Sequence, residues 1–219
     1  MLTIHTAGLL LTAAPGAAAV PGGAVAVDGD RIAAAGPYED VAAACPGARV
    51  RHWPGVLTPG LRQWHAAWLL GNAYFPDPRE YDELGDRPLT GERLAALEMT
   101  ETRRAGSVRR GLQQMLRHGT TAVAATGSFK DPVVATAVAR SGMRVVPARL
   151  APGILTGGPD LDPLREGRDL PGSVEAPLAV GGPADLAAFD VPDEAALLAA
   201  GAGTCVATVL GGRLVYRRR

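Results

Sequence analysis

The pattern of apolar residues changes twice along this chain, and those changes restrict the folds it can adopt. Short apolar runs broken by turn residues, which are typical of β-strands, fill residues 1–56 and 182–219. Between them, apolar residues recur at helical spacing, and apolar strands follow the helices. We therefore predict an α/β chain in which both ends form one small composite β-sandwich. A βα segment at 57–150 and a connector at 151–181 are inserted into it.

Two turn signals mark hairpins in the β-rich ends. They are Asp28-Gly29-Asp30 and Gly211-Gly212, where glycine tolerates the positive φ that tight hairpin turns require. We expect strands on both sides of each turn. Further strands are predicted over Leu2–Leu11, Val50–Trp53, Val56–Leu61 and Asp185–Asp190, and a short helix over Glu194–Ala200.

The middle of the chain begins with a loop over Asn72–Thr90, which is rich in Pro, Asp, Tyr and Arg and has no periodicity. A helix is predicted from Thr90 to Leu116, because apolar residues recur there at three- and four-residue spacing. We expect Gly106 to weaken or divide this helix and Gly119 to end it.

Two strands and a helix complete the predicted βα segment. Thr120–Ala125 has the composition of a buried strand, and Met143–Leu150 is predicted as the next one. Between them, Asp131-Pro132 forms an N-cap followed by proline at the first helical position. The helix that begins there should reach Arg140 and end at Gly142.

Composition excludes several functions. The chain has 22 basic and 22 acidic residues, so no charge excess favours a nucleic-acid partner. No stretch offers the roughly 18 uninterrupted apolar residues of a membrane span, so we expect a cytoplasmic protein without a membrane partner. Cys45 and Cys205 match no metal or redox spacing and are expected to be buried thiols. The terminal run from Arg217 to Arg219 is expected to be a frayed, solvated tail.

Three parts of the chain resemble the amidohydrolase superfamily, particularly its imidazolonepropionase and aminodeoxyfutalosine deaminase branch. Val56–His65 (VLTPGLRQWH) resembles the family's first barrel strand. Arg109–Val123 (RRGLQQMLRHGTTAV) is similar to the helix that leads into the second. The closing strands of the family's small β-sandwich resemble Gly182–Asp190 (GPADLAAFD) and Val209–Tyr216 (VLGGRLVY).

The resemblance implies an eight-stranded (β/α) barrel, which alone requires about 200 to 250 residues. Between Thr58 and Leu150 there is room for about three βα units, by the usual length of such a unit. We therefore predict an incomplete barrel segment at 57–150. The later strands, which supply further histidines and an aspartate in the family, would have been lost near the connector.

The metal site that the resemblance implies is incomplete. His65 matches the first histidine of the family's His-x-His pair, but the second position is Ala67, which offers no ligand. We expect no metal and no other cofactor, with His65 as a vestigial ligand position. Zinc or iron would be required if hydrolysis persists. His5 and His52 are expected to be ordinary surface or interface residues, and His118 to favour the dipole of the helix end.

Weak catalytic candidates remain at the strand ends. His65 could act as a general base or bind a ligand, and Gln63 accompanies it. Asp131 follows the second predicted strand, although a helix cap already explains it. No nucleophile motif or phosphate-binding loop is present.

Three functional hypotheses follow. The first is a degenerate family member without metal-dependent hydrolysis that acts as a binding or partner protein. Its open sheet edge would be covered by a second copy of the chain or by a larger protein. The second, implied by the resemblance, is a hydrolase or deaminase of C–N bonds in a cyclic amidine, amide or aminopurine-like substrate. A role in the futalosine route to menaquinone would be conceivable, with extra ligands from a second subunit or from Asp77, Asp82 or Asp131. The third is a decayed product that folds poorly, which the consistent capping signals oppose.

Overall fold

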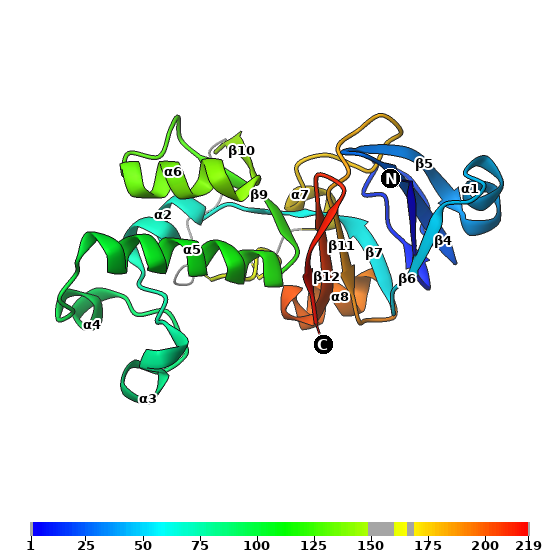
Figure 1. Cartoon of the computed structure of the whole chain (residues 1–219). Coiled ribbons are helices and arrows are strands. Elements are labelled where there is room, and N and C mark those ends of the chain that lie inside the picture. The colour runs from blue at the N-terminus through cyan, green and yellow to red at the C-terminus, as the bar shows by residue number, and fades with distance from the viewer. Residues whose placement is uncertain (1, 149–159, 166–168, 219) are drawn as a thin grey trace. The chain divides into compact units, whose positions relative to one another are not determined.

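The computed structural model describes residues 2–148, 160–165 and 169–218 and shows a mixed α/β fold (Figure 1). The predicted fold class is confirmed. The chain divides into two compact units. One, which we call the sandwich unit, comprises Met1–Arg62, Leu116–Ala122 and Asp162–Arg219. The other, the helical unit, comprises Gln63–Met115 and Val123–Leu161. The residue boundaries predicted for the domains remain a prediction.

The sandwich unit contains a four-stranded sheet in the order β5-β4-β1-β6. The strands are β1 (Thr3–Thr6), β4 (Gly23–Asp28), β5 (Arg31–Pro37) and β6 (Arg49–His52). β4 and β5 form the predicted hairpin, and Gly29 at its turn has a φ of 58°. β1 pairs antiparallel with β4 and parallel with β6, which leaves β6 at one edge of the sheet.

A six-stranded sheet in the order β13-β12-β11-β7-β2-β3 joins the two ends of the chain. Its strands are β2 (Leu9–Leu10), β3 (Val20–Pro21), β7 (Val56–Pro59), β11 (Leu186–Phe189), β12 (Cys205–Leu210) and β13 (Arg213–Arg217). The join is the antiparallel pair of β7 and β11, in which Val56 lies opposite Phe189 and Pro59 opposite Leu186. The predicted composite of both chain ends is therefore the architecture of this unit.

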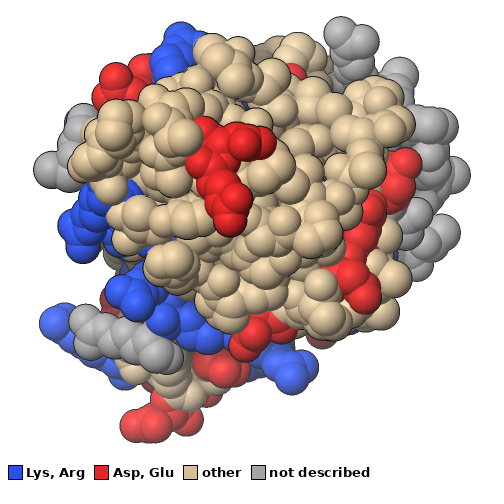
Figure 2. Space-filling model, turned by 90° about the vertical axis from the view of Figure 1, so that its right-hand side faces the viewer, with Lys and Arg blue, Asp and Glu red and all other residues tan. Residues whose placement is uncertain are grey.

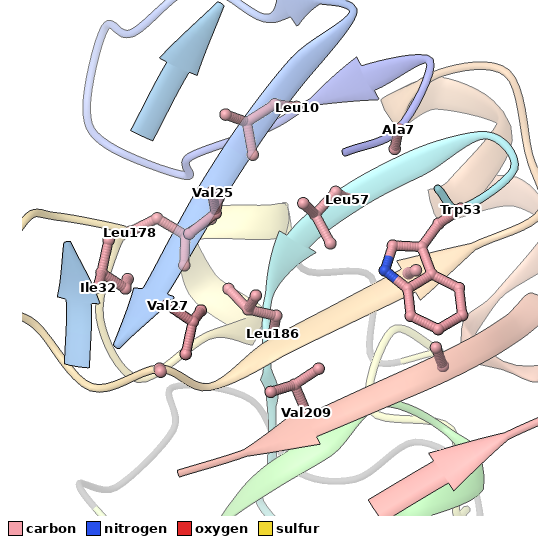
Figure 3. Packing of buried hydrophobic residues seen from close by; sticks show 13 residues of the cluster. Ala7, Leu10, Val25, Val27, Ile32, Trp53, Leu57, Leu178, Leu186 and Val209 are labelled. Atoms are coloured by element: carbon pink, nitrogen blue, oxygen red, sulfur yellow. The ribbon is translucent and has the colours of Figure 1, made fainter. Parts of the chain in front are cut away.

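The core of the sandwich unit lies between the two sheets (Figure 3). Val25, Val27 and Ile32 come from the four-stranded sheet and pack with Leu186 and Val209 of the six-stranded sheet. Each such side chain is at most 2% exposed, and full burial of an aliphatic side chain contributes about 1.5–3 kcal/mol. The core therefore ties strands that are far apart in sequence into one folding unit.

Short helices cover the outer faces of both sheets. α1 (Tyr38–Ala44), which the sequence analysis missed, packs Val41 against the outer side of the four-stranded sheet. On the six-stranded sheet, α7 (Leu170–Ser173) and α8 (Glu194–Ala200) bury Leu170 and Leu197. A 3₁₀ turn at Ala202–Thr204 leads from α8 into β12.

A three-stranded sheet in the order β10-β9-β8 carries the βα segment, and β8 and β9 each continue from one unit into the other. The strands are β8 (Leu61–Gln63), β9 (Thr120–Ala125) and β10 (Arg144–Pro147). They alternate along the chain with α2 (Ala66–Asn72), α5 (Glu101–Arg117) and α6 (Pro132–Ser141). The described residues contain no closed barrel. The end of the predicted strand, at residues 149–150, lies outside the described residues.

The local signals around α5 and α6 give mixed outcomes. Gly119 (φ 75°) and Gly142 (φ 78°) follow the two helices, as predicted. Gly106 does not divide α5, because the helix runs unbroken from Glu101 to Arg117. The interruption lies earlier, between α4 (Gly91–Ala95) and α5, where Thr100 accepts a hydrogen bond from the Arg103 backbone N–H. A hydroxyl at a helix start favours a new helix there.

The predicted loop over Asn72–Thr90 is more ordered than its composition indicated. It contains a 3₁₀ turn at Pro78–Glu80 and the short helix α3 (Tyr81–Leu84). Tyr74 and Leu89 close its base with two backbone hydrogen bonds of 2.9 and 2.8 Å. Among the helices of the described ranges, none is long and apolar enough to cross a membrane.

Candidate functional site

Gln63, at the end of β8, is fully buried and its side-chain amide is committed to structural hydrogen bonds. The amide nitrogen donates to the carbonyls of Asp160 and Leu161, each at 3.1 Å. The amide oxygen accepts the backbone N–H of His65 at 3.0 Å. Gln63 therefore ties the strand end to residues 160–161 of the connector, a role that sequence reasoning had not assigned to it.

His65 stands at the N-cap of α2, with φ −97° and ψ 12°. The His-x-His pair that the resemblance implies would share one face if both positions lay in a strand, because residues i and i+2 of a strand point to the same face. In this chain the strand ends at Gln63 and the helix begins at Ala66. Ala67 is thus the second residue of a helix, and His65 precedes that helix as its cap. Accordingly His65 is half-buried, whereas Ala67 is exposed.

Asp131 is the N-cap of α6 and accepts the backbone N–H of Val133 at 2.8 Å. The same carboxylate forms a 2.8 Å ion pair with the guanidinium of Arg104 on α5. Hydrogen bonds from Arg104, followed by those from its own helix, lower the pKa of Asp131 against the opposing effect of burial. Arg104 also donates to the carbonyl of Gly71 at 3.0 Å, so the pair joins three helices.

The three candidate residues thus have different surroundings. A hydrogen bond joins Gln63 to His65 at the start of α2, whereas Asp131 is bonded to Arg104, which contacts the last turn of α2. These hydrogen bonds hold the start and the last turn of α2 and the start of α6 in place. Arg104 could not be predicted as the partner of Asp131, because the two lie 27 residues apart in sequence and no local pattern connects them.

A second polar cluster holds the base of the loop over Asn72–Thr90. The hydroxyl of Tyr74 donates to Glu80 at 2.5 Å, and Arg103 donates to Tyr74 at 3.0 Å and to Glu80 at 2.8 Å. Burial and the hydrogen bond to Glu80 raise the pKa of Tyr74. Burial alone would raise the pKa of Glu80, but hydrogen bonds from Tyr74, the Asp77 backbone and Arg103 lower it. The ion pair and hydrogen bonds of this cluster therefore hold the base of the loop against α5.

The acidic residues that the hydrolase hypothesis would recruit have other roles or are exposed. Asp77 is paired with Arg110 at 3.1 Å, and Arg110 also donates to the carbonyl of Phe75 at 2.8 Å. Asp82 lies exposed on α3. Among the residues that the structure describes, neither these two nor Asp131 belongs to a group of three or more potential metal ligands.

The remaining histidines and the cysteines were predicted with mixed success. His5 is 2% exposed, so the expectation of a surface residue is wrong; β1 places its ring in the sandwich unit beside Trp53. His52 is exposed and contacts the ring of Tyr38. Cys45 and Cys205 are free and buried, as predicted.

The donor set does not fit a catalytic metal. Such a zinc generally requires three protein ligands and an open position. Within residues 2–148, 160–165 and 169–218, there is no group of three or more His, Cys, Asp or Glu side chains that could hold an ion. The remaining residues of the sequence add only one side chain of these types, Glu166.

Residues 23–48 match the family model of the imidazolonepropionase-like composite domain of bacteria. This segment covers β4, β5 and α1 of the sandwich unit. The resemblance predicted from the sequence is confirmed here, for the composite domain. No curated protein matches the chain.

Among solved structures, the chain is similar to A. niger ochratoxinase, with 21% identity and a TM-score of 0.43 over 67% of this chain and 31% of that one. A zinc-bound adenosine deaminase from Xanthomonas campestris gives 21% identity and a TM-score of 0.41 over 66% and 33%. Guanine deaminase from Bradyrhizobium japonicum gives 23% and 0.40 over 66% and 34%. The chain spans about a third of the length of these proteins.

Proposed function

We propose that this chain is an amidohydrolase-like protein that no longer performs metal-dependent hydrolysis and instead acts as a binding or partner protein. The observation that carries the proposal is the helix that begins at Ala66. It turns the second position of the metal pair, Ala67, into solvent and leaves His65 at a helix cap. The loss is therefore one of backbone geometry as well as of side-chain chemistry.

The contacts of the other candidates support the same proposal. A general base must accept the substrate proton, which the neutral amide of Gln63 does not do. The Asp131 carboxylate already accepts hydrogen bonds from Val133 and Arg104. Asp131 is moreover held ionised by Arg104, with its pKa below the ordinary value, which makes it a weak base near neutral pH. The arrangement suits a rigid scaffold.

The partner role is supported by the edge of the three-stranded sheet. β10 is the outermost strand of that sheet in the described part of the chain, and its Val145 is 49% exposed. An exposed apolar side chain on an edge strand favours association, so we propose that a second copy or a larger protein covers this edge.

Metal analysis of the untagged protein tests the proposal. The protein would be supplied with zinc, iron or manganese, purified without chelators and measured by inductively coupled plasma mass spectrometry beside His65→Ala. We expect well below one metal ion per chain in both proteins. Near-stoichiometric metal that disappears in His65→Ala would overturn the proposal and favour hydrolysis of a C–N bond.

A further inference from the structure

Trp53 closes one side of the sandwich unit, between the edge strands β6 and β13. It follows β6 directly, is 8% exposed and belongs to the core between the sheets. The guanidinium carbon of Arg217, on β13, lies 5.8 Å from the centroid of the Trp53 ring. The expectation of a frayed tail is therefore wrong for Arg217, which is the last residue of a strand.

An irregularity in the pairing of β12 with β13 directs Arg217 towards Trp53. The register shifts between Thr208 and Val209, so that Leu214 lies opposite Val209 and Arg217 opposite Ala207. Val209 and Ala207 both face the core between the sheets. Arg217 is thereby placed on the core side at the rim, as β-bulges often re-aim a side chain.

Arg51 reaches the same rim from the other sheet. It lies opposite His5 in the parallel pair of β1 and β6, and the ring of His5 lies beside Trp53, with 6.0 Å between the ring centroids. Burial and then the positive charge of Arg51 lower the pKa of His5. Arg51 and Arg217 thus border one indole ring from two sheets.

The two edge strands and the residue after β13 are basic and carry no acidic residue. Their arginines are Arg49, Arg51, Arg213, Arg217 and Arg218, of which Arg218 donates to the carbonyl of Gly203. Arg49 and Arg51 alternate with Val50, which packs on the outer face of its sheet, so both lie on the core side. None of them forms an ion pair with a carboxylate of the described residues, whereas Arg62, Arg103, Arg104 and Arg110 each do. Figure 2 shows Lys and Arg side chains gathered on one side of the visible face, with Asp and Glu side chains close by.

We propose that this basic rim, defined by Arg49, Arg51 and Arg217 beside Trp53, binds an acidic peptide segment of a partner protein. Guanidinium groups pair with carboxylates in bidentate fashion, and alternate residues of a strand lie about 7 Å apart, so the array suits several carboxylates in succession. Trp53 supplies an apolar floor beneath them.

Two other modes of binding fit the rim less well. A polyphosphate such as a nucleic acid requires a broad positive field, but the chain has no net charge. Addition of a strand to β13 is opposed by its irregular register and its charged side chains, which are features that protect sheet edges. The rim would therefore recognise its partner through side chains. The inference does not depend on whether the protein binds metal.

Fluorescence anisotropy of a labelled hexaglutamate peptide tests the inference at fixed ionic strength. The double variant Arg51→Gln/Arg217→Gln should bind about tenfold more weakly than the wild type. The control Arg109→Gln/Arg140→Gln removes the same charge from exposed positions of α5 and α6 and should bind as the wild type does. The indole Nε1–H resonance of Trp53 reports whether each variant is folded.

A second variant keeps the test decisive if glutamine unfolds the rim. Arg51→Lys/Arg217→Lys preserves the charge but not the planar fork, and it should also bind the peptide more weakly than the wild type does. Unchanged affinity in the folded double variant, or an equal loss in the control, would overturn the inference. Tighter binding of a six-nucleotide oligothymidine than of hexaglutamate would also overturn it, in favour of a polyphosphate ligand.

Discussion

The indole Nε1–H of Trp53 donates a 3.0 Å hydrogen bond to Nδ1 of His5, and both side chains are buried in the sandwich unit. Because Nδ1 accepts this bond, a neutral His5 carries its proton on Nε2. Protonation of Nδ1 would replace the acceptor with a second donor facing the indole N–H. The pair therefore requires His5 to be neutral.

Stability should consequently fall in mild acid. Burial and the nearby charge of Arg51 lower the pKa of His5 from 6.5 to about 4 in the folded protein. The unfolded chain then binds more protons than the folded one between these values, so stability is lost as pH falls from about 6.5 to about 4. At about 1.4 kcal/mol for each pKa unit, the difference corresponds to about 3 kcal/mol. Urea unfolding at several pH values measures this loss in the free energy of unfolding.

Two histidine variants separate this effect from the titration of carboxylates. His5→Gln should lack the part of the pH dependence that lies between pH 6.5 and pH 5. His52→Gln, at an exposed position, should retain it. An identical pH slope for wild type and His5→Gln would show that His5 does not control the loss.

Two glycines of α5 should respond oppositely to alanine. A Cβ at Gly111 would lie 2.7 Å from Cε2 of the buried Phe75, so Gly111→Ala should destabilise the protein by about 1–3 kcal/mol. At Gly106 the nearest atom, 3.1 Å away, is at the flexible end of Arg110, and alanine favours a helix by about 1 kcal/mol over glycine. Gly106→Ala should therefore stabilise it. Thermal unfolding of both variants measures the two changes in stability. Changes of the same sign would contradict the packing described for these glycines.

The pair of Arg104 and Asp131 should show a measurable coupling energy. Asp131→Asn removes the charged acceptor, and Arg104→Met removes the donor while keeping the aliphatic chain. In a double-mutant cycle we expect a coupling of about 1 kcal/mol, because the charge-assisted bond links three helices. Asp193→Asn, at the cap of α8, combined with Arg104→Met serves as the uncoupled control. Additive effects of Arg104→Met and Asp131→Asn would rule out the proposed bridge.

Asp162, within the connector, should anchor that segment to the backbone at Ala202. Its buried carboxylate accepts the backbone N–H groups of Leu164 and Ala202, each at 2.9 Å. Asp162→Ala leaves both groups without this acceptor and should cost about 1–3 kcal/mol. Asp40→Ala, at an exposed position of α1, should change stability little. Equal unfolding midpoints for the two variants would refute the anchoring role.

Signals contained in a few consecutive residues made much of the fold predictable. Asp28-Gly29-Asp30 specifies its hairpin, and Asp131-Pro132 specifies the start of α6, because each depends on backbone preferences within one turn. The β-rich pattern of both chain ends predicted that they form one β domain. That the C-terminal strands complete a sandwich with the N-terminal ones came from the resemblance, since β7 and β11 lie far apart in sequence.

The features that sequence reasoning missed depend on tertiary contacts. Nothing local indicates that His5 accepts a bond from Trp53, 48 residues away, or that Arg104 pairs with Asp131. The broken metal pair was visible at Ala67, but the helix that begins at Ala66 was not. Its apolar positions at Ala66, Leu69 and Leu70 have helical spacing and are buried, and they could have shown it.

Zinc titration of Ala67→His tests the central claim most directly. This substitution restores the residue types of the missing pair, but position 67 lies on the exposed side of α2, whereas His65 is half-buried at its N-cap. A competition assay with a chromogenic zinc chelator, at micromolar protein, should find no added high-affinity site relative to the wild type. Stoichiometric zinc binding that requires both His65 and the new histidine would show that the two positions share a face. It would contradict the helical start on which the proposed loss of hydrolysis rests.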